Sequence, residues 1–147
     1  MSKYLVFDDL TFADEACLRA ALADLGYPEA TIERGEALPL FGYHGDRRRE
    51  TAELVVRRAH LTGASNDLGF ARRPDGGYVA IVSEYDERAL ARKHGEAPGA
   101  TFSAKLRAAY DWVAAREFAR QKERQLRRAV TVRREIVGHT QRVTVGW

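Results

Sequence analysis

The chain has 147 residues, of which 45% are hydrophobic and 31% are charged. This length suits about one domain and can bury a core without disulfides or a structural metal. The single cysteine, Cys17, cannot form an internal disulfide, and no run of residues approaches the roughly 20 apolar positions of a membrane span. The first residues also lack the apolar segment of a signal peptide, so the sequence predicts a cytoplasmic protein without a membrane partner.

Charge is distributed unevenly along the chain. Residues 100–147 contain 11 Lys and Arg against 4 Asp and Glu, a net charge of +7. Residues 1–99 contain 13 against 17, a net charge of −4. A basic final third beside a mildly acidic body can attract an acidic protein, a nucleic acid backbone or another copy of the chain.

The N-terminal segment predicts a strand followed by a helix. Residues 4–7 alternate and favour β structure, and Thr11 lies three positions before the acidic Asp14, as is typical where a helix begins. Gly26 stands where a glycine commonly ends a helix. Between these points, apolar residues recur at helical spacing: Leu18, Ala21, Leu22 and Leu25.

The middle of the chain predicts strands. Pro39 and three glycines within residues 30–46 indicate irregular backbone with a short edge strand over 38–43, and period 2 returns over 49–59. The clearest signal is the segment 67–86, in which two alternating apolar runs flank a Pro-Asp-Gly-Gly turn. This pattern predicts an antiparallel two-stranded ribbon.

The C-terminal part predicts a loop, a helix and a hairpin. Residues 87–100 hold two glycines and a proline among charges, which indicates a surface loop with at most a helical turn over 88–94. An apolar stripe from Phe102 to Phe118, with Thr101 or Ser103 as the cap, predicts the second helix. Residues 119–128 contain only one large apolar side chain, so we expect an exposed basic extension there. Two strands around Gly138 close the chain as a hairpin.

Short connections between most of these strands exclude crossovers and favour antiparallel pairing. The predicted fold class is therefore α+β, with a single, mainly antiparallel sheet of five to six strands and two helices packed on one face. Residues 1–147 form one domain in this interpretation, with the exposed basic helix extension near 119–128.

Three carboxylates are candidates for acid–base chemistry or cation binding. If the two ends of the ribbon meet, Asp67, Glu84 and Asp86 would cluster, and their mutual repulsion would raise at least one pKa. The favoured alternative is that these groups cap turns and pair with arginines such as Arg72 or Arg88. The four histidines show no recognised metal-ligand spacing, so the sequence predicts neither a metal nor a cofactor.

Two further segments are candidates for binding. Gly42-Tyr43-His44-Gly45 is interpreted as a turn at a sheet edge, because no helix follows that would complete a phosphate cradle. Arginines spaced three and four residues apart align along one side of the helix extension: Arg116, Arg120, Arg124, Arg127 and Arg128. A solvated or partner-facing helix is favoured over a nucleic acid surface, which would ordinarily add exposed aromatic side chains.

Several short motifs resemble those of a known family in their order and spacing over nearly the whole chain. They are Leu25-Gly26-Tyr27, Gly42-Tyr43-x-Gly45, Asp67-x-Gly69-Phe70, Asp75-Gly76-x-Tyr78, the helix with Lys105-Leu106 and Tyr110, and the closing Trp147. The chain thereby resembles a bacterial, cyanobacterial and plastid family of unknown function related to the conserved plastid open-reading-frame (ycf-type) proteins. It departs from that pattern in the charged loop at 88–100 and in the extra arginines of the second helix. The resemblance implies a compact accessory or assembly protein and no catalytic residue.

Three functional hypotheses follow. The first is a non-enzymatic cytosolic accessory protein that binds a protein partner through a sheet edge shaped by Gly42, Tyr43, Gly69 and Phe70 and through Arg120, Arg124, Arg127 and Arg128. The alternative is a nucleic-acid-binding protein that uses the basic C-terminal third. The third is an enzyme that uses Asp67, Glu84 and Asp86. The sequence fixes no oligomeric state.

Overall fold

The structure is a computed structural model that describes residues 4–61, 63–93, 101–137 and 140–147. Its long elements within these residues are seven strands and three helices. In chain order they are β1 (Tyr4–Phe12), α1 (Glu15–Asp24), β2 (Ile32–Phe41), β3 (Arg47–Val56), β4 (Leu68–Arg72), β5 (Tyr78–Ser83), α2 (Glu84–Lys93), α3 (Phe102–Leu126), β6 (Thr131–Val137) and β7 (Thr140–Gly146). Two short 3₁₀ turns occupy Glu29–Thr31 and Arg58–His60.

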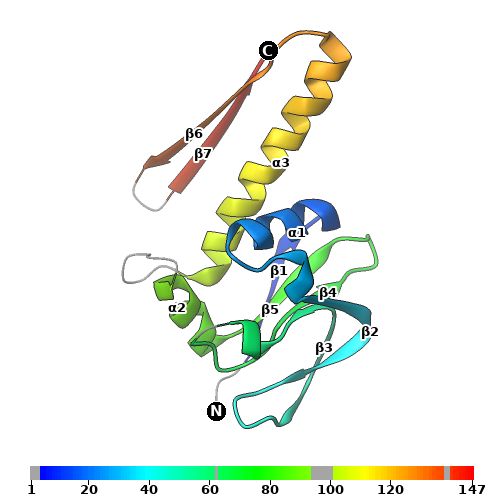
Figure 1. Cartoon of the computed structure of the whole chain (residues 1–147), viewed down its shortest axis with the longest axis vertical. Coiled ribbons are helices and arrows are strands. Elements are labelled where there is room, and N and C mark those ends of the chain that lie inside the picture. The colour runs from blue at the N-terminus through cyan, green and yellow to red at the C-terminus, as the bar shows by residue number, and fades with distance from the viewer. Residues whose placement is uncertain (1–3, 62, 94–100, 138–139) are drawn as a thin grey trace.

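The main sheet has five strands in the order β1-β5-β4-β3-β2, and every neighbouring pair is antiparallel. Helices α1 and α3 cover one face of this sheet (Figure 1). The α+β class with a mainly antiparallel sheet is therefore confirmed. The structure adds a third helix, α2, and places β6 and β7 in a separate two-stranded sheet beside α3.

Alternation along the strands divides the buried side chains between the two faces of the sheet. In β5, Ala80 and Val82 belong to the main core under α1 and α3, whereas Ile81 joins a smaller cluster on the other face. In the main core the ring of Phe12 packs edge-on against Phe70 and Tyr110. The antiparallel ribbon predicted over 67–86 is confirmed, and its register places Phe70 opposite Ala80.

The first helix begins later than the sequence indicates. Its N-cap is Asp14, whose side chain accepts a hydrogen bond from the Cys17 amide at 3.0 Å. Thr11 instead belongs to β1, which continues past residue 7 through a shift of register between Val6 and Thr11. The predicted helix end is confirmed, because Gly26 has a φ of 96° directly after the Leu25 C-cap.

Residues 32–41 form a full edge strand where irregular backbone is predicted. Two register shifts against β3 absorb the positive φ of Ala37 and the missing amide hydrogen of Pro39. An edge strand tolerates both features because only one side of it is paired. The prediction of a short strand over 38–43 was therefore wrong in extent.

A ten-residue helix, α2, replaces the first half of the predicted loop over 87–100. The Ser83 hydroxyl accepts a hydrogen bond from the Asp86 amide at 3.0 Å, and Leu90 and Ala91 are buried against the rest of the fold. This burial stabilises a segment whose own composition favours a loop. The remainder of that predicted loop, 94–100, lies outside the described residues.

The C-terminal half of α3 and the hairpin form an arm that extends from the sheet (Figure 1). We define the arm as residues 114–137 and 140–147. Thr101 caps α3 by accepting a hydrogen bond from the Ala104 amide at 3.2 Å, which confirms one of the two predicted caps. The hairpin is joined to the helix by a bond from Gln141 Nε2 to the Ala108 carbonyl at 2.8 Å.

Candidate functional site

The candidate residues from the sequence fall into three places. Gly42, Tyr43, Asp67, Glu84 and Asp86 lie in or behind one cleft in the body. The four arginines lie on the arm. Gly69 and Phe70 lie in β4 in the middle of the sheet, where both are buried, so the prediction that they shape a partner-facing edge was wrong.

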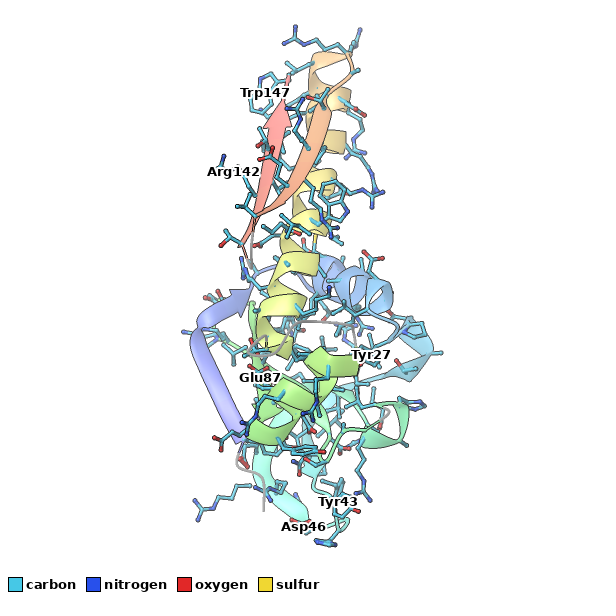
Figure 2. The ribbon with its side chains drawn as sticks, turned by 90° about the vertical axis from the view of Figure 1, so that its left-hand side faces the viewer. Tyr27, Tyr43, Asp46, Glu87, Arg142 and Trp147 are labelled. Atoms are coloured by element: carbon cyan, nitrogen blue, oxygen red, sulfur yellow. The ribbon has the colours of Figure 1, made fainter. Side chains whose placement is uncertain are left out.

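The cleft lies between the β2–β3 turn, the loop after the second 3₁₀ turn and the first turn of α2. Its volume is about 630 Å³. Figure 2 places Tyr43 and Asp46 at the end of the molecule away from Arg142 and Trp147 of the arm. Its lining is polar and aromatic: Tyr43, His44, Asp46, Gly63, Ala64, Ser65, Asn66, Glu84, Tyr85 and Arg88.

Gly42 lets the turn approach the loop closely. A Cβ atom at this position would lie 2.8 Å from Asp46 Oδ1 and 2.9 Å from Asn66 Oδ1. The amide of Gly42 donates to the Asp46 carbonyl at 2.9 Å, which closes the turn. The sequence therefore identified a glycine that the backbone requires, for a close approach within the protein.

Asp67 is a structural anchor behind the cleft. Its side chain is 3% exposed, and its Oδ2 lies 2.9 Å from Arg57 Nη1. The same carboxylate accepts hydrogen bonds from the amides of Phe41 at 2.9 Å and Arg58 at 2.8 Å. Every one of these partners is internal, so the Asp67 carboxylate is fully occupied in holding β2, β3 and the loop together.

Asp86 holds the other wall of the cleft. Its two oxygens accept hydrogen bonds from the amides of Ser65 at 2.6 Å and Asn66 at 3.0 Å. Glu84, two residues earlier, is exposed and lines the cleft. The carboxylates are thus brought to the same region, but two of the three are committed to structural bonds.

In the part of the chain that the structure describes, no group of three or more His, Cys, Asp or Glu side chains is placed to hold a metal ion. His44 lines the cleft beside Tyr43, while His60 lies in the second 3₁₀ turn. His94 and His139 lie outside the described residues.

A third buried carboxylate, Glu87, is a group that sequence reasoning missed. It accepts hydrogen bonds from the Ser103 amide at 2.8 Å and the Ser103 hydroxyl at 2.7 Å, and so joins α2 to the start of α3. Burial raises the pKa of Glu87, and these two hydrogen bonds partly oppose that rise. No spacing rule in the sequence links positions 87 and 103.

The arm carries the predicted arginines in exposed positions. Arg120, Arg124, Arg127 and Arg128 are all exposed. Arg120 lies 3.2 Å from the Glu117 carboxylate, and Arg124 approaches the same carboxylate at 3.9 Å. Exposed ion pairs of this kind are weak, so they leave both guanidinium groups available to a partner.

Exposed apolar side chains gather on the same arm. Of the seven large hydrophobic side chains exposed among the described residues, two (Tyr43 and Tyr85) line the cleft. The other five lie on the arm: Phe118, Leu126, Ile136, Val137 and Trp147. The arm therefore combines exposed apolar surface with an excess of positive charge.

One part of this surface is a cluster of two aromatic rings, tilted by 57° to each other, and a lysine. The rings of Phe118 and Trp147 lie 5.9 Å apart between centroids. Lys122 Nζ lies 5.6 Å from the Phe118 ring and 5.2 Å from the Trp147 ring. These contacts form only when the hairpin folds back along α3, so the spacing of these residues in the sequence gives no signal of them.

Comparison of the chain with protein-family models, curated proteins and solved structures returns no match. The resemblance to the plastid open-reading-frame family therefore stays a prediction. None of the described helices is both long and apolar enough to cross a membrane.

Proposed function

We propose that this protein is a cytoplasmic, non-enzymatic accessory protein whose arm docks to an acidic partner protein. The observation that carries the proposal is the grouping of five exposed hydrophobic side chains on the arm. Residues 114–147 also contain nine Lys and Arg against three Glu. Apolar anchors give affinity to a protein interface, while complementary charge gives specificity and fast association.

The arm and the cleft would contact different binding partners. Tyr43 and Trp147 lie toward opposite ends of the molecule, so the turn at Gly42 and the basic helix do not form one continuous surface (Figure 2). The proposal therefore assigns the docking role to the arm alone. The cleft has the mixed polar and aromatic lining of a separate binding surface.

The test is recovery of associated proteins from the native host with a tagged chain. In one variant Arg120, Arg124, Arg127 and Arg128 are all replaced by Glu. In the charge-matched control the same replacement is made at four exposed arginines of the body, Arg47, Arg49, Arg72 and Arg92. Loss of an acidic partner with the arm variant alone supports the proposal, and equal recovery with both variants contradicts it.

A specific observation favours nucleic acid as a second candidate. The cluster of Phe118, Lys122 and Trp147 joins two exposed rings to a cation, and the bases of single-stranded nucleic acids stack on exposed aromatic rings beside positive charge. Binding would then weaken steeply with salt and with Trp147→Ala. If single-stranded RNA and DNA do not bind even at about 50 mM salt, where phosphate contacts are strongest, this candidate is excluded.

A further inference from the structure

Strand β6 presents one unpaired edge. It pairs with β7 on one side, and no other described strand pairs with its second side. In Figure 1 this edge faces away from α3 and from the main sheet. The side chains of Ile136 and Val137 are 63% and 72% exposed. Such an edge offers free amide and carbonyl groups to another strand.

The sequence of β6 is self-complementary when two copies run antiparallel. With Arg134 of each copy at the centre, Arg133 of one lies opposite Glu135 of the other, and Val132 lies opposite Ile136. A two-fold axis makes each of these pairs twice. Arg133–Glu135 is thereby matched in charge and Val132–Ile136 in hydrophobicity, while the end pair, Thr131 and Val137, shares only β-branching.

The central Arg134 has a partner within its own copy. Its guanidinium lies 5.5 Å from the centroid of the Trp112 ring on α3. This contact directs the charge toward the helix and reduces the repulsion between two arginines at the axis. Val132 and Ile136 alternate onto the same face of β6 as Arg134, so their cross-strand pairs would lie on the side that carries α3.

From this complementarity we infer that β6 pairs with β6 of a second copy, which joins the two hairpins into one four-stranded antiparallel sheet with two-fold symmetry. In isologous pairing of this kind the assembly is complete with two copies, and the unpaired β6 edge of each copy is covered. Strands of seven residues bury less surface than a standard interface, so we expect a dimer with an affinity on the order of micromolar. This inference uses none of the arginines of α3, but it covers Ile136 and Val137, two of the five exposed hydrophobic side chains of the arm.

The first test measures mass in solution at about 100 µM protein, well above the expected affinity. The wild-type chain should have twice the 16.5 kDa of one copy. Arg133→Glu places like charges opposite each other twice, while leaving the hairpin intact because Thr144 is its partner on β7. We expect this variant to weaken the dimer by about tenfold or more, since two attractive pairs become repulsive.

Two further variants make the result decisive. The triple variant R133E/E135R/R142E restores opposite charges across the axis and keeps them within the hairpin, where Glu135 lies opposite Arg142, so it should recover the dimer. Arg128→Glu makes the same change of charge on the arm outside β6 and should leave the dimer intact. A wild-type monomer at about 100 µM overturns the inference, as does a dimer that R133E does not weaken.

A cross-link tests the register. Facing residues at the axis have Cα atoms about 4.5–5.5 Å apart, so Arg134→Cys should form a disulfide-linked dimer on mild oxidation. Thr144→Cys on β7 lies on the far strand and should not. Cross-linking of the second variant but not the first would show pairing through the other edge and would overturn the inference.

Discussion

Asp67 and Arg57 form an ion pair behind the cleft, with Oδ2 and Nη1 2.9 Å apart and the Asp67 side chain 3% exposed. The pair joins the end of β3 to the residue before β4, and Arg57 also donates to the Pro39 carbonyl of β2 at 2.7 Å. Three strands of the main sheet therefore depend on one carboxylate. This is the structural role that the sequence-based alternative assigned to such groups.

Asp67→Asn should lower the free energy of unfolding by about 2–4 kcal/mol, because the amide cannot replace all the bonds of the carboxylate and leaves Arg57 underpaired. Chemical denaturation measures this loss. Glu33→Gln is the matched control, since Glu33 pairs with the same Arg57 but is 51% exposed. The control should cost less than about 1 kcal/mol. Equal losses in both variants would contradict the anchoring role of Asp67.

Gly42→Ala should destabilise the protein by about 1–3 kcal/mol, because the added methyl group would press against Asp46 Oδ1 and Asn66 Oδ1. The nearest atom to a Cβ at Gly77 lies 3.3 Å away, so Gly77→Ala should be better tolerated. Thermal unfolding of the two variants gives the comparison. A fully stable Gly42→Ala protein would show that the β2–β3 turn can move away from the loop.

The free energy of unfolding of the Glu87→Gln variant should increase relative to that of the wild type as pH rises. The pKa of Glu87 is raised above its ordinary value of 4.5, so the native state binds this proton more tightly than the unfolded state. The contribution of Glu87 to stability therefore falls as pH rises from the ordinary pKa through the native one. The E87Q amide stays neutral and keeps acceptor capacity for Ser103. Denaturation at about pH 4 and pH 7 measures the difference, and a pH-independent difference would contradict this assignment.

Arg127→Gly should stabilise the end of α3. Arg127 has a φ of 53°, in the left-handed region where glycine is favoured, and its amide donates to the Glu123 carbonyl at 2.8 Å. The gain should be about 0.5–1 kcal/mol, which a rise in the unfolding temperature would detect. Arg128→Gly serves as the control, because Arg128 has no positive φ. An equal effect in both variants would mean that lost charge, not backbone geometry, is responsible.

Local sequence patterns predicted the strands and the helix in which apolar residues recur with an uninterrupted period. The ribbon of β4 and β5 and the first helix follow from period 2 and period 3.6 in the sequence. The full length of β2 was not predicted, because its two register shifts against β3 interrupt the period of 2. α2 escaped because its stability depends on burying Leu90 and on the bonds between Glu87 and Ser103, which are tertiary contacts.

The candidate site was predicted only in fragments for the same reason. The sequence singled out Gly42, Tyr43, Glu84 and Asp86 as two unrelated groups, and the fold brings them to one cleft. It also separated Phe118 from Trp147, which meet only because β7 returns along α3. Gly69 and Phe70 were assigned to a sheet edge because the sequence pattern around a glycine does not distinguish an edge strand from a central strand.

The most direct measurement of the docking proposal is photo-cross-linking from the arm in the native host. A photoreactive residue replaces Gln125, which is exposed beside Lys122 on α3, and a control chain carries it at the exposed Arg49 of the body. We predict that an acidic protein is captured from position 125 and not from position 49. Capture of that protein only from position 49, or of nuclease-sensitive material only from position 125, would contradict docking through the arm.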